Sequence, residues 1–114
     1  MNDLTPQTDC KLLVMAAEAV GFPNYTVSGN FLFVETGPCR GSSGYYWNPG
    51  GDDGDCARME AALGIHVAWH SDGVVCGLRW AGATELFDDH GGDKQAARRL
   101  ASLRVAAEHG RAKP

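Results

Sequence analysis

Two histidines, His66 and His70, have a spacing that could serve metal binding, because residues four apart in a β-strand lie on one face of the sheet. Imidazole nitrogens are common zinc ligands. A hairpin that turns at Asp72 and Gly73 would set Arg79 directly opposite His66, and a fixed positive charge there disfavours a second cation. We therefore interpret both histidines as residues of a half-exposed sheet face and expect no bound metal ion.

Two glycine-rich segments could bind ions or phosphates. Residues 48–55, Asn-Pro-Gly-Gly-Asp-Asp-Gly-Asp, are superficially similar to a calcium-binding loop, but they lack the alternating oxygen ligands and the closing glutamate. Residues 41–44, Gly-Ser-Ser-Gly, could cradle a phosphate, but neither a lysine nor a helix start follows them as in a P-loop. We interpret the acids of the first segment as the start of a helix.

Candidate nucleophiles are present without a catalytic pattern. Cys39, Ser42 and Ser43 fall in one loop and His90 falls in a distant turn, so no motif indicates a triad among them. The cysteines are widely separated and include no C-x-x-C pair, which disfavours a structural zinc site. We expect no catalytic residues, no cofactor and no enzymatic activity. We also expect four reduced thiols, at Cys10, Cys39, Cys56 and Cys76.

The composition is that of one ordinary globular domain. The chain has 114 residues, 44% of them hydrophobic and 21% charged, which predicts a single domain over residues 1–114 with flexible tails at 1–4 and 111–114. The net charge of −4 argues against direct, sequence-independent binding to nucleic-acid phosphates. The sequence shows neither a signal-peptide pattern nor an apolar run of about 18 residues, so we expect no membrane contact and an intracellular location.

The strongest candidate binding residues lie in a long loop predicted for residues 37–51. Loops of this length in compact domains are often functional. Arg40, Tyr45 and Tyr46 are residue types that dominate protein–protein interfaces, so we predict that they bind a partner. Local packing of the two tyrosines is the alternative. Trp47 is expected to cover the end of the core.

Basic residues are concentrated near the C-terminus, after an acidic stretch. We interpret them either as the solvated face of a helix or as a basic stripe that docks on an acidic partner. In the second interpretation, Arg98, Arg99 and Arg104 are partner-binding residues.

These candidate residues must be positioned by helices and strands. Apolar residues at helical spacing predict three helices, over residues 6–20, 53–63 and 93–108. Asp52 is the expected N-cap of the second helix, and Gly64 and Gly110 are expected to end the second and third.

Alternating apolar residues predict two β-hairpins and a short edge strand, over residues 24–35, 65–80 and 85–87. The first hairpin pairs Val27 with Leu32 and leaves Phe31 and Phe33 on the opposite face, so both faces are expected to be at least partly covered.

The second hairpin is predicted to pair Val67 with Leu78 and to direct Trp69 and Trp80 into the core. The element order is then α-β-β-α-β-β-(β)-α. We predict the α+β class, with an antiparallel sheet of four to five strands packed with three helices.

Two segments resemble a known family. Residues 47–55, Trp-Asn-Pro-Gly-Gly-Asp-Asp-Gly-Asp, continued by Cys-Ala-Arg-Met at 56–59 and Leu-Gly at 63–64, resemble a segment of small tailed-bacteriophage proteins of the phage ABA sandwich type. Gln-Ala-Ala-Arg-Arg-Leu at 95–100 resembles that family's C-terminal helix. The resemblance implies an α/β/α sandwich and no catalytic residues, because its members are mostly of unknown function.

Three functional hypotheses follow. The first is a non-enzymatic phage accessory protein, acting in the host cytoplasm, that binds and inhibits a host protein, above all an antiviral defence component such as a CRISPR effector complex. Acidic inhibitors can occupy the basic channels of such targets. The second is a protein that sequesters a signalling nucleotide, held by residues 41–44 and the basic helix. The third is an enzyme with an unrecognised site. The sequence does not decide whether two copies of the chain associate into a homodimer.

Overall fold

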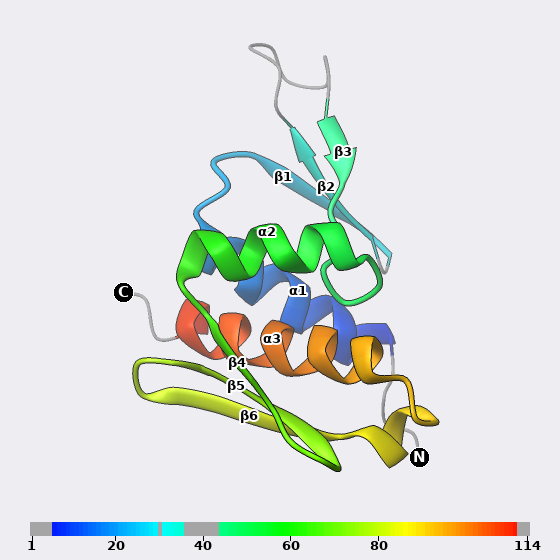
Figure 1. The fold of residues 1–114 in the computed structure, drawn as a ribbon. Coiled ribbons are helices and arrows are strands. Elements are labelled where there is room, and N and C mark those ends of the chain that lie inside the picture. Colours follow the sequence, from blue (N-terminus) through cyan, green and yellow to red (C-terminus); the bar gives the residue numbers. More distant parts are fainter. Residues whose placement is uncertain (1–5, 30, 36–43, 112–114) are drawn as a thin grey trace.

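The fold places helices between two small β-sheets. The computed structural model describes residues 6–29, 31–35 and 44–111, with side chains described from Lys11 onward. Over these ranges it contains two three-stranded antiparallel sheets, ordered β1-β2-β3 and β4-β5-β6. Helices α1, α2 and α3 lie between the sheets, as Figure 1 shows. The long axis of the molecule is 47 Å.

The α+β class is confirmed, but the single sheet of four to five strands is not. Helix α2 connects the two sheets, so the first hairpin and the second lie on opposite sides of the helices. The observed layering also differs from an α/β/α sandwich, in which a sheet would be central. One core cluster nevertheless includes buried residues of both sheets, so the chain folds around one interior.

The N-terminal third agrees with the sequence prediction. Helix α1 spans Pro6–Val20, and the hairpin consists of β1, Tyr25–Ser28, and β2, Phe31–Glu35. Val27 pairs with Leu32, as predicted. A third strand, β3 (Gly44–Tyr46), pairs with β2 inside the segment that was predicted to be a loop.

Helix α2 spans Asp53–Leu63 and has the predicted ends. The Asp52 carboxylate accepts a hydrogen bond from the Asp55 backbone N–H at 2.8 Å, which caps the helix. Gly64 ends it with a left-handed conformation, φ +79°. The Asp55 carboxylate accepts the Asn48 N–H at 2.9 Å, so the acids fix the approach of the chain to the helix.

The lower sheet consists of β4 (His66–Trp69), β5 (Gly73–Leu78) and β6 (Ala81–Leu86). Its first hairpin differs by two residues from the predicted register. Val67 pairs with Cys76 rather than with Leu78. Gly73 begins β5 instead of forming the turn, and a Cβ atom there would come within 2.8 Å of the Glu85 carbonyl oxygen. A shift of two residues leaves the assignment of faces unchanged.

Both tryptophans of the lower sheet are largely exposed, and the prediction that they face the core is wrong for Trp80. Arg79 and Trp80 form the turn between β5 and β6, which leaves Trp80 61% exposed. Trp69 shares the face of Val74, with which it pairs, and its ring centroid lies 6.1 Å from that of the buried Phe87, so its predicted face is confirmed. It remains 48% exposed because it lies on the edge strand β4. His66 pairs with Gly77, not with Arg79, so the predicted charge repulsion at His66 does not arise from this pairing.

Helix α3 (Lys94–Arg111) packs against both other helices and the lower sheet. The Asp93 carboxylate accepts the Ala96 N–H at 3.0 Å at its start. The helix continues through Gly110, which was predicted to end it, because Gly110 lies where α3 approaches α1 closely. A 3₁₀ turn, η1 (Phe87–His90), connects β6 to this helix region.

Candidate protein-binding surface

The outer face of the upper sheet carries three aromatic residues. Successive side chains of a strand point to opposite faces, so Leu32 and Val34 of β2 are buried while Phe31 and Phe33 point away from the core. Tyr46 of β3 pairs with Phe33 and shares its face. Phe31 is 64% exposed and Tyr46 is 65% exposed. We call these three residues, Phe31, Phe33 and Tyr46, the aromatic face.

The rings of the aromatic face hold one another in place. The Tyr46 ring centroid lies 5.2 Å from that of Phe33 and 5.9 Å from that of Phe31, with interplanar angles of 74° and 64°. These are the edge-to-face contacts that aromatic pairs prefer. A Cβ atom at Gly44 would come within 2.2 Å of the Val34 carbonyl oxygen and 2.7 Å of the Phe33 ring, so glycine there leaves space for both. The three rings therefore form one continuous contact surface.

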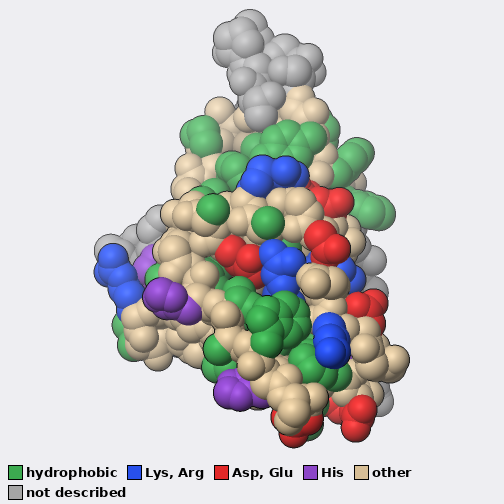
Figure 2. All heavy atoms as spheres, viewed as in Figure 1, with side chains coloured by type: hydrophobic (Ala, Val, Ile, Leu, Met, Phe, Trp, Pro, Cys, Tyr) green, Lys and Arg blue, Asp and Glu red, His purple; other side chains and the backbone are tan. Residues whose placement is uncertain are grey.

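A groove lies at the edge of the aromatic face. Its volume is about 350 Å3, and its lining consists of Phe31, Leu32, Tyr46, Trp47 and Asn48. Figure 2 shows apolar side chains gathered over the end of the molecule where Figure 1 places the upper sheet. Exposed apolar surface of this kind marks interaction sites on soluble proteins.

The structure separates the predicted loop residues from one another. Tyr45 and Tyr46 are neighbours in β3 and therefore face opposite sides of the sheet. Tyr45 lines a separate cavity of about 190 Å3 together with Arg58 of α2. Trp47 is buried against Phe22, with ring centroids 5.0 Å apart, which confirms its predicted place over the core.

Arg40, Cys39, Ser42 and Ser43 lie outside the described residues, so the structure does not place them. Phe31 and Phe33 were not predicted as binding residues. Their alternation with Leu32 did place them on the second face of the strand, but that face was expected to be covered.

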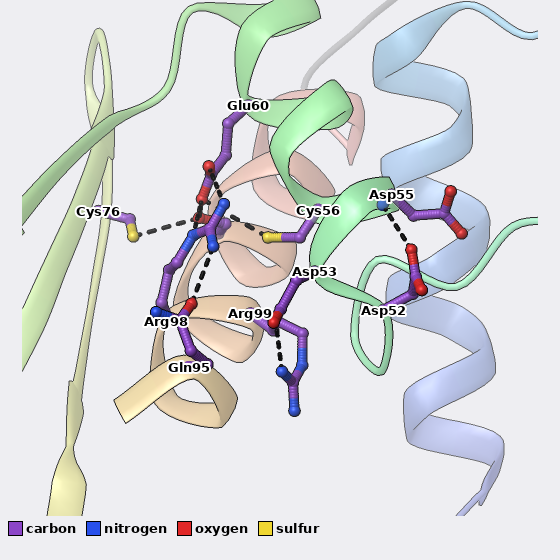
Figure 3. Close-up of polar contacts among 10 residues, drawn as sticks. Asp52, Asp53, Asp55, Cys56, Glu60, Cys76, Gln95, Arg98 and Arg99 are labelled. Atoms are coloured by element: carbon purple, nitrogen blue, oxygen red, sulfur yellow. Dashed lines mark hydrogen bonds and ion pairs between the residues drawn. The ribbon is translucent and has the colours of Figure 1, made fainter. Parts of the chain in front are cut away.

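The basic residues of α3 are engaged within the molecule. Arg98 forms two hydrogen bonds to Glu60 of α2, at 3.0 Å and 2.7 Å, and Arg99 pairs with Asp53 at 2.6 Å (Figure 3). Arg104 pairs with Glu85 of β6. Each arginine therefore contributes to holding α3 against its neighbours, and partner binding through them would compete with these ion pairs.

A polar cluster surrounds Glu60 between α2 and α3 (Figure 3). Ser102 and the Cys56 thiol both donate to the Glu60 carboxylate, and Cys76 lies 3.2 Å from the Ser102 hydroxyl. Burial opposes ionisation of Glu60, but the hydrogen bonds from Arg98 and Ser102 outweigh it and lower its pKa.

The same surroundings keep the two thiols protonated. Burial, reinforced by the Glu60 charge, raises the pKa of Cys56 to about 12. Burial also raises the pKa of Cys76. Since the thiolate is the reactive form, neither cysteine is activated as a nucleophile.

A second groove, of about 360 Å3, lies between the 48–51 turn, α1 and the start of α3. Its lining is mostly apolar, with the polar side chains of Asn48 and His90. His90 Nε2 lies 2.9 Å from Glu85, a buried carboxylate that also pairs with Arg104. This arrangement orients the imidazole. Among the described residues, the groove lining contains no serine or cysteine that could act as a nucleophile beside it.

Comparisons with protein-family models, with curated proteins and with solved structures find no match for this chain. The resemblance to phage ABA sandwich proteins therefore stays a prediction. Within residues 6–29 and 44–111, no helix combines the length and apolar character needed to cross a membrane. The described side chains also form no group of three or more potential metal ligands.

Proposed function

We propose that this chain is a non-enzymatic, phage-encoded accessory protein that binds a host protein through the aromatic face and inhibits it. The observation that carries the proposal is the exposure of Phe31 and Tyr46 as two rings in contact on the outer face of a sheet. Leaving two such rings in water costs free energy that a partner surface would recover. The proposed class of target is an antiviral defence component, such as a CRISPR effector complex.

The net charge supports this class of target. Effectors that hold nucleic acids have basic channels, and an acidic protein of net charge −4 is attracted to them. Arg98 and Arg99 form ion pairs with carboxylates of α2, and these carboxylates partly neutralise their positive charges. An acidic, aromatic contact surface is therefore favoured over the basic stripe of α3.

The experiment compares two exposed aromatic sites in one chain. Phe31→Ala with Tyr46→Ala removes two rings of the aromatic face, and Trp80→Ala removes a similarly exposed ring at the opposite sheet. Each protein is tested for capture of partners from host lysate and for protection of a plasmid against CRISPR interference. Loss of both activities in the Phe31 and Tyr46 variant alone is expected. Equal activity of both variants would exclude the aromatic face.

A second candidate function is small-molecule binding, favoured by the groove that contains Asn48 and His90. The predicted phosphate contacts do not support a nucleotide there, because Arg98 and Arg99 pair with carboxylates and residues 41–43 lie outside the described residues. A thermal-shift panel of nucleotides, run on the wild type and His90→Ala, tests this candidate. A rise in melting temperature that His90→Ala abolishes would favour it.

A further inference from the structure

Two carboxylates belong to the segments that flank the aromatic face. Glu35 follows Phe33 by two residues in β2 and therefore lies on the same outer face of the sheet. The groove reaches Asn48, whose carbonyl oxygen accepts the Asp52 N–H at 2.8 Å. Asp52 is exposed and lies four residues after that groove residue, and its carboxylate caps α2 beside the Arg58 guanidinium. In Figure 2, acidic side chains adjoin apolar ones at the border of this end of the molecule.

Aromatic rings and carboxylates attract the same kind of group. The face of an aromatic ring carries partial negative charge and attracts a cation within about 6 Å of its centroid. The chain already contains one such contact, because Lys94 Nζ lies 5.4 Å from the Phe87 centroid. The rings of Phe31 and Tyr46 are more exposed than that of Phe87. Carboxylates nearby add longer-range attraction for the same cation.

We propose that the groove beside Phe31 and Tyr46 receives a cationic side chain, an arginine or a lysine, of the protein partner. This inference rests on the proposed function and adds the chemistry of the contact. Ring faces attract the charged group, and the apolar lining from Leu32 and Trp47 covers its aliphatic stem. The carboxylates of Glu35 and Asp52 lie outside that lining and accept hydrogen bonds from Thr26 and from the Asp55 N–H, so they add attraction only at longer range. An apolar partner side chain would gain nothing from the two acids.

The first test uses a small probe and its neutral isostere. Acetyl-Gly-Arg-Gly-amide and the corresponding citrulline peptide have nearly the same shape, but only the first is charged. Ring resonances of Phe31 and Tyr46 are followed by NMR during titration of each peptide. The arginine peptide is expected to shift them saturably in the millimolar range, about tenfold more tightly than the citrulline peptide. Equal binding of the two peptides, or no binding of either, would overturn the inference.

The second test changes the charge and keeps the fold. Asp52→Asn retains the helix cap, because asparagine caps as well as aspartate, and Glu35→Gln retains the size of the side chain. The double variant is expected to bind the arginine peptide roughly threefold to tenfold more weakly. A control with Asp72→Asn and Asp89→Asn makes the same change of net charge at the lower sheet and at η1. An equal loss in both double variants would exclude a local role of Glu35 and Asp52.

The outcomes separate this inference from the proposed function. If the aromatic variant loses host-protein capture while the arginine peptide does not bind, the aromatic face binds a partner by other chemistry. If the arginine peptide binds but capture survives the loss of Phe31 and Tyr46, the groove accepts cations and the proposed function fails.

Discussion

Gly110 of α3 lies against the backbone carbonyl of Met15 in α1, and a Cβ atom on Gly110 would come within 1.8 Å of the Met15 oxygen. The two helices can take this separation only because Gly110 has no side chain. The contact explains why a glycine occupies a position inside α3, where glycine is otherwise unfavourable.

Gly110→Ala is therefore expected to destabilise the protein by about 1–3 kcal/mol, because the helices must move apart to accommodate the methyl group. Gly82→Ala is the matched control, since a Cβ atom there would lie 3.7 Å from its nearest neighbour, an ordinary contact distance. Urea denaturation of both variants measures the difference. A Gly110→Ala variant as stable as the control would show that the helices separate at little cost.

Trp47→Ala is expected to lower the free energy of unfolding by roughly 3 kcal/mol or more, as truncations of buried aromatic residues do. Trp47 is 3% exposed and packs edge-on against Phe22. Trp80→Ala removes the same side chain from an exposed turn and should change the free energy far less. Thermal or chemical denaturation of the two variants makes the comparison, and similar losses would contradict the assigned positions.

Glu60→Gln should destabilise the protein by about 3 kcal/mol, because it leaves Arg98 largely buried without its counter-charge. The pKa of Glu60 is lowered by folding, so its ionised form stabilises the native state above the unfolded pKa, near 4.5. This stability is lost as the pH falls below that value, through the folded pKa. Denaturation at a series of pH values should show a shallower acid-side decline in Glu60→Gln than in wild type. Parallel curves would exclude Glu60 as a source of that decline.

Cys56 and Cys76 are expected to resist alkylation in the native protein. In a Cys10→Ser, Cys39→Ser background they are the two remaining thiols. Iodoacetamide at about pH 8 should leave both unmodified until guanidinium chloride unfolds the chain, because burial keeps them protonated. Mass spectrometry counts the modified thiols. Rapid native modification would mean that the cluster between α2 and α3 opens frequently.

Local sequence signals predicted the helices and the first hairpin well. The cap at Asp52 and the stop at Gly64 act within one turn, so neighbouring residues suffice to define α2. The prediction of a helix end at Gly110 is wrong because the role of this glycine depends on Met15, which is distant in the sequence.

The register of the second hairpin and the division into two sheets depend on tertiary contacts in the same way. Gly73 carries a strong turn signal, but the close approach of β6 places it within a strand. The candidate site was predicted in part. Tyr46 was identified by residue type and by its neighbourhood, whereas Phe31 and Phe33 required knowledge of which sheet face lacks a cover.

The three tryptophans are natural fluorophores that differ in their exposure to solvent. Trp47 lines the groove of the aromatic face, whereas Trp69 and Trp80 belong to the sheet at the far end of the molecule. Replacing Trp69 and Trp80 by phenylalanine would leave Trp47 as the single emitter. Its shielded position gives a blue-shifted baseline, and a charged group entering the groove would perturb that emission directly. The fold thus provides an optical reporter beneath its own candidate contact surface, without any added label.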